Sequence, residues 1–247
     1  MITIVMPYRD RQRQLTRTLL SIKSNDKFNV IIVDDNSPDH LQLPKLDYQC
    51  KVIKLNNKTW NNPEPVYNTG IIEAMKYNPE IIIVQNPECL HSGDIIKHAK
   101  KNCNDTNYLT YGCFSLSKES TEKQLYQTNN NGASRDGQDA WYNHTLYRPV
   151  AYEFCAAITA ENMRKLNGYD ERLMYGWGSG DRYFLFRTKL LSLKVEIIDS
   201  PFVFHQFHYS VPAFYNNAAN IQINNQEYNK LIAERNYKAV HLITSDL

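Results

Sequence analysis

The segment that most constrains the fold is residues 81–91, which reads IIIVQNPECLH. Its first four residues are aliphatic and three are isoleucines, a pattern typical of a strand buried on both faces. The strand ends in a polar turn, Asn86-Pro87-Glu88, which supplies one carboxylate. In open α/β sheets, ligands bind beyond the carboxyl ends of such strands. Taken alone, however, an ordinary turn after a buried strand is the simpler interpretation.

Strands and helices alternate through the first half of the chain. Strands are expected at residues 2–6, 28–33, 51–55, 81–84 and 108–111, and helices at residues 11–23 and 69–77. Asp94 is expected to cap a further helix that begins beside it. This alternation favours βαβ units and a mainly parallel sheet. The sequence contains neither GxGxxG nor GxxxxGK[ST], which argues against a dinucleotide fingerprint and a P-loop.

Two further strands end in charged turns, Pro7-Tyr8-Arg9-Asp10 and Asp34-Asp35-Asn36-Ser37. A single acidic strand end is usually a cap or a turn. Because the carboxyl ends of parallel strands meet at one edge of a sheet, these turns and the one at Glu88 are expected to lie together. Three polar strand ends on one edge favour a binding site.

Composition excludes several classes of protein. The chain has 247 residues, 42% of them hydrophobic, and a net charge of only +2. It therefore lacks the strong positive electrostatic potential expected of a nucleic-acid-binding protein. No apolar run approaches the roughly 18–20 residues of a membrane span. The first expected strand begins at residue 2, leaving no room for a signal peptide, so a cytoplasmic location is expected. The five scattered cysteines, without CxxC spacing, indicate reduced thiols rather than disulfides or zinc.

The second half is less regular. Residues 115–149 are polar without sustained periodicity, as in a functional or disordered loop. Within them, Trp141 is either a sugar-stacking platform or a hydrophobic anchor for the loop. A strand at 152–160, a helix at 161–166 ending at Asn167-Gly168, and a tail helix at 226–237 are also expected. Glycines around Trp177 indicate a backbone that a ligand approaches closely. Asp181 then begins a helix, where capping is its simplest role.

These motifs resemble those of the inverting, GT-A-fold nucleotide-sugar glycosyltransferases of family 2. The first half matches in P-Y-R, V-D-D-N-S and Asn68-Thr69-Gly70. The segment LNGYDERLMYGWGSGD is similar to the GGFDE…GWGxED region of the β-1,4-galactosyltransferase-like group. The resemblance runs from Ile2 to His208. It implies an α/β, Rossmann-like GT-A fold: a central, mostly parallel sheet flanked by helices, with a smaller acceptor-binding lobe.

The resemblance also implies an organisation within one continuous domain. A donor-binding half would span residues 1–112, a polar flap 113–150, an acceptor and catalytic half 151–212, and a helical tail 213–247. The implied activity is transfer of a sugar from a nucleotide-sugar, expected to be a UDP-sugar, to a hydroxyl acceptor with inversion of anomeric configuration.

Residue roles follow from the same resemblance. The implied nucleotide-binding residues are Pro7, Tyr8, Arg9, Asp34, Asp35, Asn68 and Asn86. The metal-binding D-x-D falls on Asn86-Pro87-Glu88, where an amide replaces one acid, so Glu88 would be the direct ligand of Mn²⁺ or Mg²⁺. A histidine completes the metal shell in such enzymes; His205 is preferred and His208 is the alternative. Asp181 falls on the catalytic base, and Trp177, Gly178, Trp141, Asp170 and Glu171 would face the acceptor.

Two other functions stay open. The amide at Asn86, and Gly180 in place of the acid that precedes the base in galactosyltransferases, are consistent with a degenerate nucleotide- or glycan-binding module. Retention of Glu88, Asp181 and both histidines argues against it. A nucleotidyltransferase would show a Gly-rich basic loop after its first strand, and PYRDRQRQ contains no glycine. The arginines of that segment are explained by a donor diphosphate or by a solvated helix face.

Overall fold

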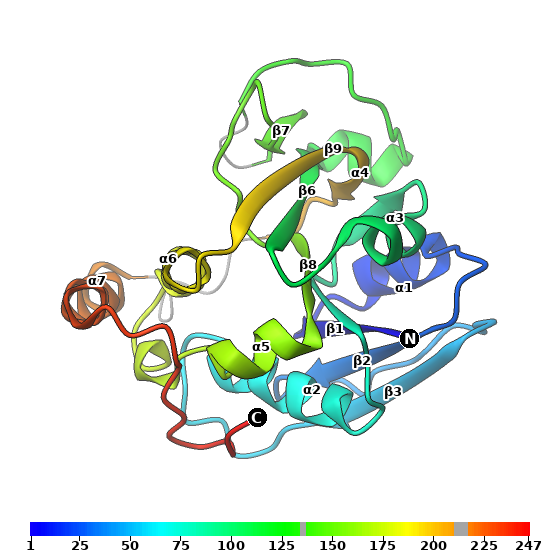
Figure 1. The fold of residues 1–247 in the computed structure, drawn as a ribbon. Helices are drawn as coiled ribbons and strands as arrows, with labels where there is room; N and C mark the ends of the chain where they lie inside the picture. The colour runs from blue at the N-terminus through cyan, green and yellow to red at the C-terminus, as the bar shows by residue number, and fades with distance from the viewer. Residues whose placement is uncertain (134–136, 210–216) are drawn as a thin grey trace.

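The computed structural model of the chain describes residues 1–133, 137–209 and 217–247. One nine-stranded sheet is flanked by helices on both faces (Figure 1). The elements are β1 (Ile2–Tyr8), α1 (Gln12–Ser21), β2 (Phe28–Asp34), β3 (Gln49–Lys54), α2 (Glu64–Met75), β4 (Ile81–Gln85), β5 (Cys89–Ser92), α3 (Ile95–Asn102), β6 (Asn107–Ser115), α4 (Lys118–Lys123), β7 (Ala140–Asn143), β8 (Cys155–Thr159), α5 (Ala160–Leu166), the 3₁₀ turn η1 (Glu171–Leu173), α6 (Gly180–Leu190), β9 (Lys194–His205) and α7 (Ala218–Glu234).

The sheet has the order β3-β2-β1-β4-β8-β6-β9-β5, with β7 paired to β6. Strands β1 to β4 are mutually parallel, as the βαβ pattern predicts. Among the later strands, β6 and β9 pair parallel, whereas β8, β7 and β5 pair antiparallel to β4, β6 and β9. The predicted α/β class is confirmed, with parallel pairing concentrated in the first half and a mixed sheet in the second.

Alternating side chains of β1 divide the core into two layers. Ile4 and Met6 face the layer that contains Leu15 and Leu19 of α1, together with α3. Val5 faces the opposite layer, formed by α2, α5 and α6. The buried strand predicted at residues 81–84 is confirmed, since every residue of β4 is buried. The sheet therefore presents the carboxyl ends of β1, β2 and β4 at one edge, between two closely packed layers.

Four element predictions need correction. The tail helix expected at residues 226–237 is α7, which begins at Ala218 and ends at Glu234. Helix α2 begins at Glu64 rather than at residue 69, because the prolines at 63 and 65 are compatible with a first helical turn that needs no N–H donor. Residues 115–149 include α4 and β7; α4 escapes a periodicity search because only Thr121 is buried in it. The turn after β4 continues into the short strand β5. The expected boundary between residues 212 and 213 lies outside the described residues.

Among the described residues, no helix combines the length and the apolarity needed to cross a bilayer.

Gly70 sets how closely α2 approaches the sheet. A Cβ added there would overlap Cγ1 of Val5 and lie 3.0 Å from Cγ2 of Val33. Both neighbours are β-branched and buried, so neither can rotate away. We expect Gly70→Ala to destabilise the protein by about 1–3 kcal/mol, as overpacked cores do, measured by urea unfolding. Gly132→Ala, in an exposed loop, is the control; equal stability of the two variants would contradict this packing argument.

Candidate functional site

The three polar strand ends meet, as the sequence predicts. The main-chain N–H of Asp35 donates to the carbonyl of Tyr8 at 2.8 Å, and the N–H of Asp10 donates to Ser37 Oγ at 3.1 Å. The third end joins them because Arg11 Nη1 donates to Glu88 Oε2 at 2.8 Å. These contacts place the turns after β1, β2 and β4 at one edge of the sheet.

Asp35 lies in a pocket of donors. Its Oδ1 accepts from Trp60 Nε1 at 2.9 Å, its Oδ2 pairs with Lys58, and Arg9 Nη1 lies 3.9 Å from Oδ2. Burial raises the pKa of the Asp35 carboxyl, and the lysine and indole oppose that rise. Trp60 and Lys58 could not be identified from the sequence, because the loop that carries them follows no recognisable pattern. Asp35 is thus held rigidly beside the loop that carries Arg9.

Asp34, in contrast, stabilises its own turn. It is buried, and its Oδ1 accepts from the main-chain N–H of Ser37 at 2.9 Å. Lys54 Nζ lies 4.0 Å from Oδ2. Asp34 therefore shapes the turn that presents Asp35.

Glu88 gathers two histidines. His205 Nε2 lies 3.2 Å and His208 Nε2 lies 3.5 Å from Glu88 Oε1. Ligand atoms of the three residues all lie within 4.8 Å of one another. They meet because β9 pairs antiparallel with β5, which puts His205 opposite Cys89 in the register. Both histidines named from the sequence thus belong to one cluster.

The charge of Glu88 is balanced on two sides. Burial disfavours its ionised form, but Arg11, His205 and His208 outweigh burial and hold the pKa of Glu88 well below its usual range. Burial lowers the pKa of His205, against the pull of the carboxylate. Both effects favour a carboxylate next to a neutral imidazole. The sequence suggested a donor diphosphate or a solvated helix face for Arg11, but not its bond to Glu88, because the two residues lie 77 positions apart.

These residues fit a divalent metal. Arg11 occupies Oε2 of Glu88, so Oε1 and the two imidazole nitrogens converge on a common point. A mixed set of one carboxylate oxygen and two imidazoles suits Mn²⁺ better than Mg²⁺, which takes oxygen ligands.

Asp181 lies in the first turn of α6, after the glycine-rich loop. Gly178 and Ser179 both adopt left-handed backbone, with φ of 74° and 67°. Asn62 clamps this loop: it accepts from the N–H of Gly178 at 3.1 Å and donates to its carbonyl at 3.0 Å. Asp181 is exposed to solvent, yet protein crowds it closely enough that desolvation raises the pKa of its carboxyl. The result is a solvent-accessible carboxylate whose pKa is raised by the protein around it.

Two buried acids that were not predicted from the sequence lie close to Asp181. Glu64 is 2% exposed, and its Oε1 accepts from Asn62 Nδ2 at 2.8 Å. A Cβ on Gly180 would lie 2.5 Å from that same Oε1. Gly180, the departure from the galactosyltransferase pattern, therefore makes room for the Glu64 carboxyl. The second acid, Glu153, lies just before β8 and is 4% exposed.

Three residues assigned to ligands from the sequence hold the protein together instead. Asn68 is fully buried; its side chain donates to the carbonyl of Tyr169 and to Glu171 and accepts from the N–H of Tyr169. Asp170 accepts two hydrogen bonds from the guanidinium of Arg172, one on each carboxylate oxygen. Glu171 accepts from the N–H groups of residues 242, 243 and 244. Their polar groups are thus engaged in joining α2, η1 and the C-terminal segment.

Trp141 is a hydrophobic anchor, the second of its two expected roles. It is 5% exposed and packs against Phe114 and Phe202. Its neighbour Tyr142 points to the other face of β7, where its ring meets that of His205 at 5.2 Å between centroids. Trp177 is half-buried, and its main-chain N–H donates to the main-chain carbonyl of Asn220. Tyr142 is therefore the aromatic residue of this strand that lies next to His205, one of the candidate metal ligands.

Stacked tyrosines connect the two ends of the site. Tyr67 donates to Asn86 Oδ1 at 3.4 Å, and its ring stacks on Tyr169 with centroids 4.4 Å apart. Tyr169 in turn donates to Glu153 at 2.6 Å. This path runs from the turn after β4 to the acids around Asp181.

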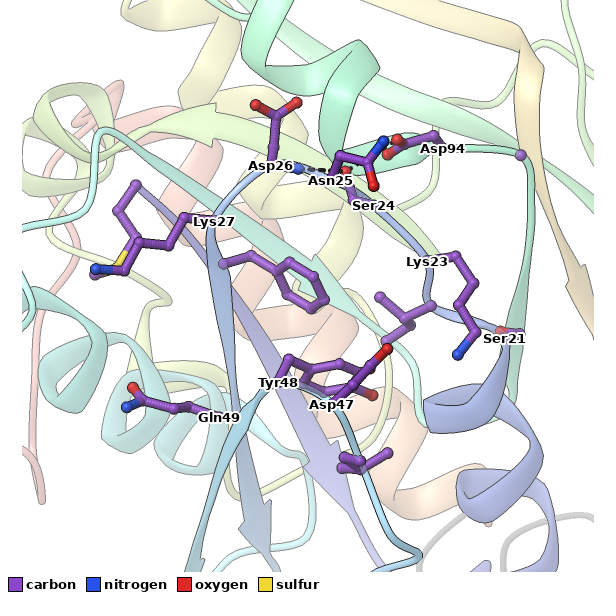
Figure 2. Close-up of a pocket in the computed structure, with 15 residues that line it drawn as sticks. Ser21, Lys23, Ser24, Asn25, Asp26, Lys27, Asp47, Tyr48, Gln49 and Asp94 are labelled. Carbon is purple, nitrogen blue, oxygen red and sulfur yellow. Dashed lines mark hydrogen bonds between the residues drawn. The ribbon is translucent and has the colours of Figure 1, made fainter.

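A separate hollow lies at the amino ends of β1 and β2 (Figure 2). Phe28 and Tyr48 line it, and Ser24 donates to Asp94 across it. Among the described residues, none of the predicted site residues lines this hollow. Since ligands of parallel sheets bind at the carboxyl ends of strands, we do not place the donor there.

The sequence profile of Glycosyl transferase family 2 matches residues 3–152 of the chain. No curated protein sequence matches it.

Solved structures share the fold. S. aureus TarS 1-349 in complex with UDP superposes with a TM-score of 0.62 at 13% identity, covering 95% of this chain and 64% of that one. Its complex with UDP-GlcNAc gives a TM-score of 0.63 at 11% identity, covering 95% and 65%. The catalytic domain of Drosophila β1,4-galactosyltransferase 7, in complex with xylobiose, gives 0.53 at 12% identity, covering 84% and 71%. The chain thus spans less than two thirds of the TarS structures, and at these identities the likeness establishes the GT-A fold alone.

Proposed function

This chain belongs to glycosyl transferase family 2, and we propose that it transfers a sugar from a UDP-sugar to a hydroxyl acceptor with inversion at the anomeric carbon. The observation that carries the proposal is the meeting of Glu88, His205 and His208 at the carboxyl edge of the sheet. This is where an open α/β sheet binds ligands, and where a family 2 enzyme needs to hold a diphosphate.

The donor is proposed to lie along the turns after β1 and β2. Asp35 would accept from the N–H of a uracil ring, while Pro7, Tyr8 and Arg9 line the nucleoside. The cations around Asp35 support this placement, since Arg9 and Lys58 lie beside the carboxylate. The TarS complexes with UDP and UDP-GlcNAc support uridine as the base. Asn86, held by Tyr67, would contact the ribose.

The metal is proposed to be Mn²⁺, held by Oε1 of Glu88 and by the two histidines. A bound divalent ion acts as a Lewis acid on a leaving diphosphate. Arg11, fixed on the other oxygen of Glu88, adds positive charge to the same region.

Asp181 is proposed to take the proton of the acceptor hydroxyl as it attacks. A carboxylate within hydrogen-bond reach of the nucleophile performs this step. Its exposure and its place beside the half-buried Trp177 support the role. A Cβ on Gly178 would meet nothing within 4 Å, which leaves open space beside this loop for an acceptor. Direct attack opposite the leaving group gives inversion.

The proposal is tested by titrating UDP into the purified protein with Mn²⁺, Mg²⁺ or EDTA. We expect binding with Mn²⁺ to be tightest and to raise the melting temperature, because a ligand at 100 times its Kd adds about 2.7 kcal/mol of stability. CDP in place of UDP is the control for the base. Binding with release of UDP from UDP-sugars supports a transferase. Binding without turnover on any donor or acceptor supports the degenerate module, and no binding to UDP refutes the proposed donor site.

A further inference from the structure

Glu153 is a buried acid to which the proposed reaction assigns no role. It precedes β8 and lies among aromatic side chains from several parts of the chain. The groups that act on it are Tyr108 of β6, Tyr67 of α2, Tyr169 before η1, and Asp181 and Arg187 of α6. A carboxyl group in such surroundings needs either a cation or a proton to be stable.

The hydrogen bonds of Glu153 divide unevenly between its two oxygens. Oε2 accepts from Tyr169 Oη at 2.6 Å and from Tyr108 Oη at 3.3 Å. Oε1 is buried, and no donor among the described residues reaches it. The Asp181 carboxyl lies close enough to Glu153 for the two side chains to shift each other's pKa. With Oε2 taken by two tyrosines, Oε1 is the oxygen left for Asp181.

The charge of Arg187 opposes the rise in the pKa of Glu153 but does not reverse it. Arg187, the cation on the facing helix, directs its guanidinium to the carbonyls of Leu166 and Gly168. Among the described residues, Glu153 takes part in no ion pair. Burial first, and the nearby charge of Asp181 second, raise the pKa of Glu153 well above its usual range. Two carboxyls in contact share one proton, and the more exposed of them is the one that ionises.

We infer that Glu153 is a positioning residue: as a neutral carboxylic acid it donates Oε1–H to Asp181, fixes that side chain, and leaves the second Asp181 oxygen for the acceptor hydroxyl. The inference rests on the proposed role of Asp181 as the base. Its chemistry is self-consistent, because the two tyrosine hydroxyls donate to the oxygen of Glu153 that carries no proton. Glu153 itself gains and loses no proton during transfer.

Two substitutions test the inference. Glu153→Gln offers an N–H to Asp181 and a carbonyl to both tyrosines, so we expect kcat close to that of the wild type. Glu153→Leu removes the donor; we expect kcat to fall by up to about 100-fold, the cost of a misplaced catalytic group. In the Glu153→Leu variant, the acidic limb of the pH profile of kcat is also expected to move to higher pH, since Glu153 lowers the pKa of Asp181. A Gln variant as impaired as the Leu variant, or an unimpaired Leu variant, overturns the inference.

A second measurement requires no transferase activity and needs only Glu153→Gln. Because the folded-state pKa of Glu153 is raised, its contribution to stability is complete below the unfolded-state value of about 4.3 and is lost as pH rises toward the folded-state value. Glutamine has no such loss. The melting temperature of Glu153→Gln relative to the wild type should therefore increase as pH rises above the unfolded-state value.

The two measurements separate the possible failures. A melting-temperature difference that is constant with pH overturns the neutral acid, whatever the activity. If the melting-temperature difference rises with pH as expected but the protein transfers no sugar, the proposed function is refuted. The proton shared by Glu153 and Asp181 is then still supported.

Discussion

Replacing Asp181 with asparagine is expected to lower kcat by about 10²- to 10⁴-fold, the usual contribution of a general base. The amide cannot accept the acceptor's proton, while its size preserves the first turn of α6. UDP binding should change little, because the residues proposed to hold the nucleotide lie on the turns after β1 and β2. The measurement is kcat and KM for the donor at saturating acceptor, with calorimetry of UDP alongside.

Asp26→Asn is the matched control, since Asp26 lines the hollow at the opposite edge of the sheet. It should leave kcat unchanged. In the wild type, the acidic limb of kcat should lie above the ordinary aspartate range of about 3.9, because desolvation raises the pKa of Asp181 and the base must be ionised. Near-normal turnover of Asp181→Asn would remove Asp181 from the reaction and direct the search for the base to its neighbours.

The edge of the sheet was predictable because local pattern and topology agree there. The apolar runs that became β1, β2 and β4 are unambiguous, and parallel pairing brings their carboxyl ends to one side. The turns at Asp35 and Glu88 could then be expected to lie together before any contact was known. Their proximity follows from the chain's own alternation of strands and helices.

Roles assigned residue by residue were less reliable, because a motif does not show where a side chain points. Asn68 and Glu171 lie in motifs that match the family pattern, yet the side chains of both form hydrogen bonds that join distant segments of the chain. Trp141 and Tyr142 show the same limit at a spacing of one residue. Successive residues of a strand face opposite sides, and only the observed pairing of β7 with β6 decides which aromatic residue faces His205.

The contacts that could not be predicted from the sequence join residues that lie far apart in the chain. Arg11 bonds Glu88 across 77 positions, and Asn62 reaches Gly178 across 116. Glu64 becomes meaningful only through the space that Gly180 leaves for it. A single sequence carries no record of such pairs, since each member looks like an ordinary surface polar residue.

The candidate metal site at Glu88, His205 and His208 leads to the second large effect. Glu88→Gln is expected to abolish the Mn²⁺ dependence of UDP binding and to lower kcat by about 10³-fold, because a Lewis acid at the leaving group supplies several kcal/mol and 1.36 kcal/mol corresponds to a tenfold change. The amide keeps the volume of the buried side chain but removes the charge that the metal requires. Calorimetry of UDP with Mn²⁺ and with EDTA, and kcat at saturating Mn²⁺, measure the two effects.

Glu161→Gln, on the exposed face of α5, is the control for the same chemical change and should alter neither quantity. The substitution also deprives Arg11 of its carboxylate, so the outcome distinguishes two ways of neutralising a diphosphate. If the cluster holds a metal, losing Glu88 weakens UDP binding. If Arg11 and the two histidines themselves meet the phosphates, the freed guanidinium should bind UDP at least as tightly, with or without Mn²⁺. Tighter, metal-indifferent binding by Glu88→Gln would therefore refute the metal site and identify Arg11 as the principal diphosphate ligand.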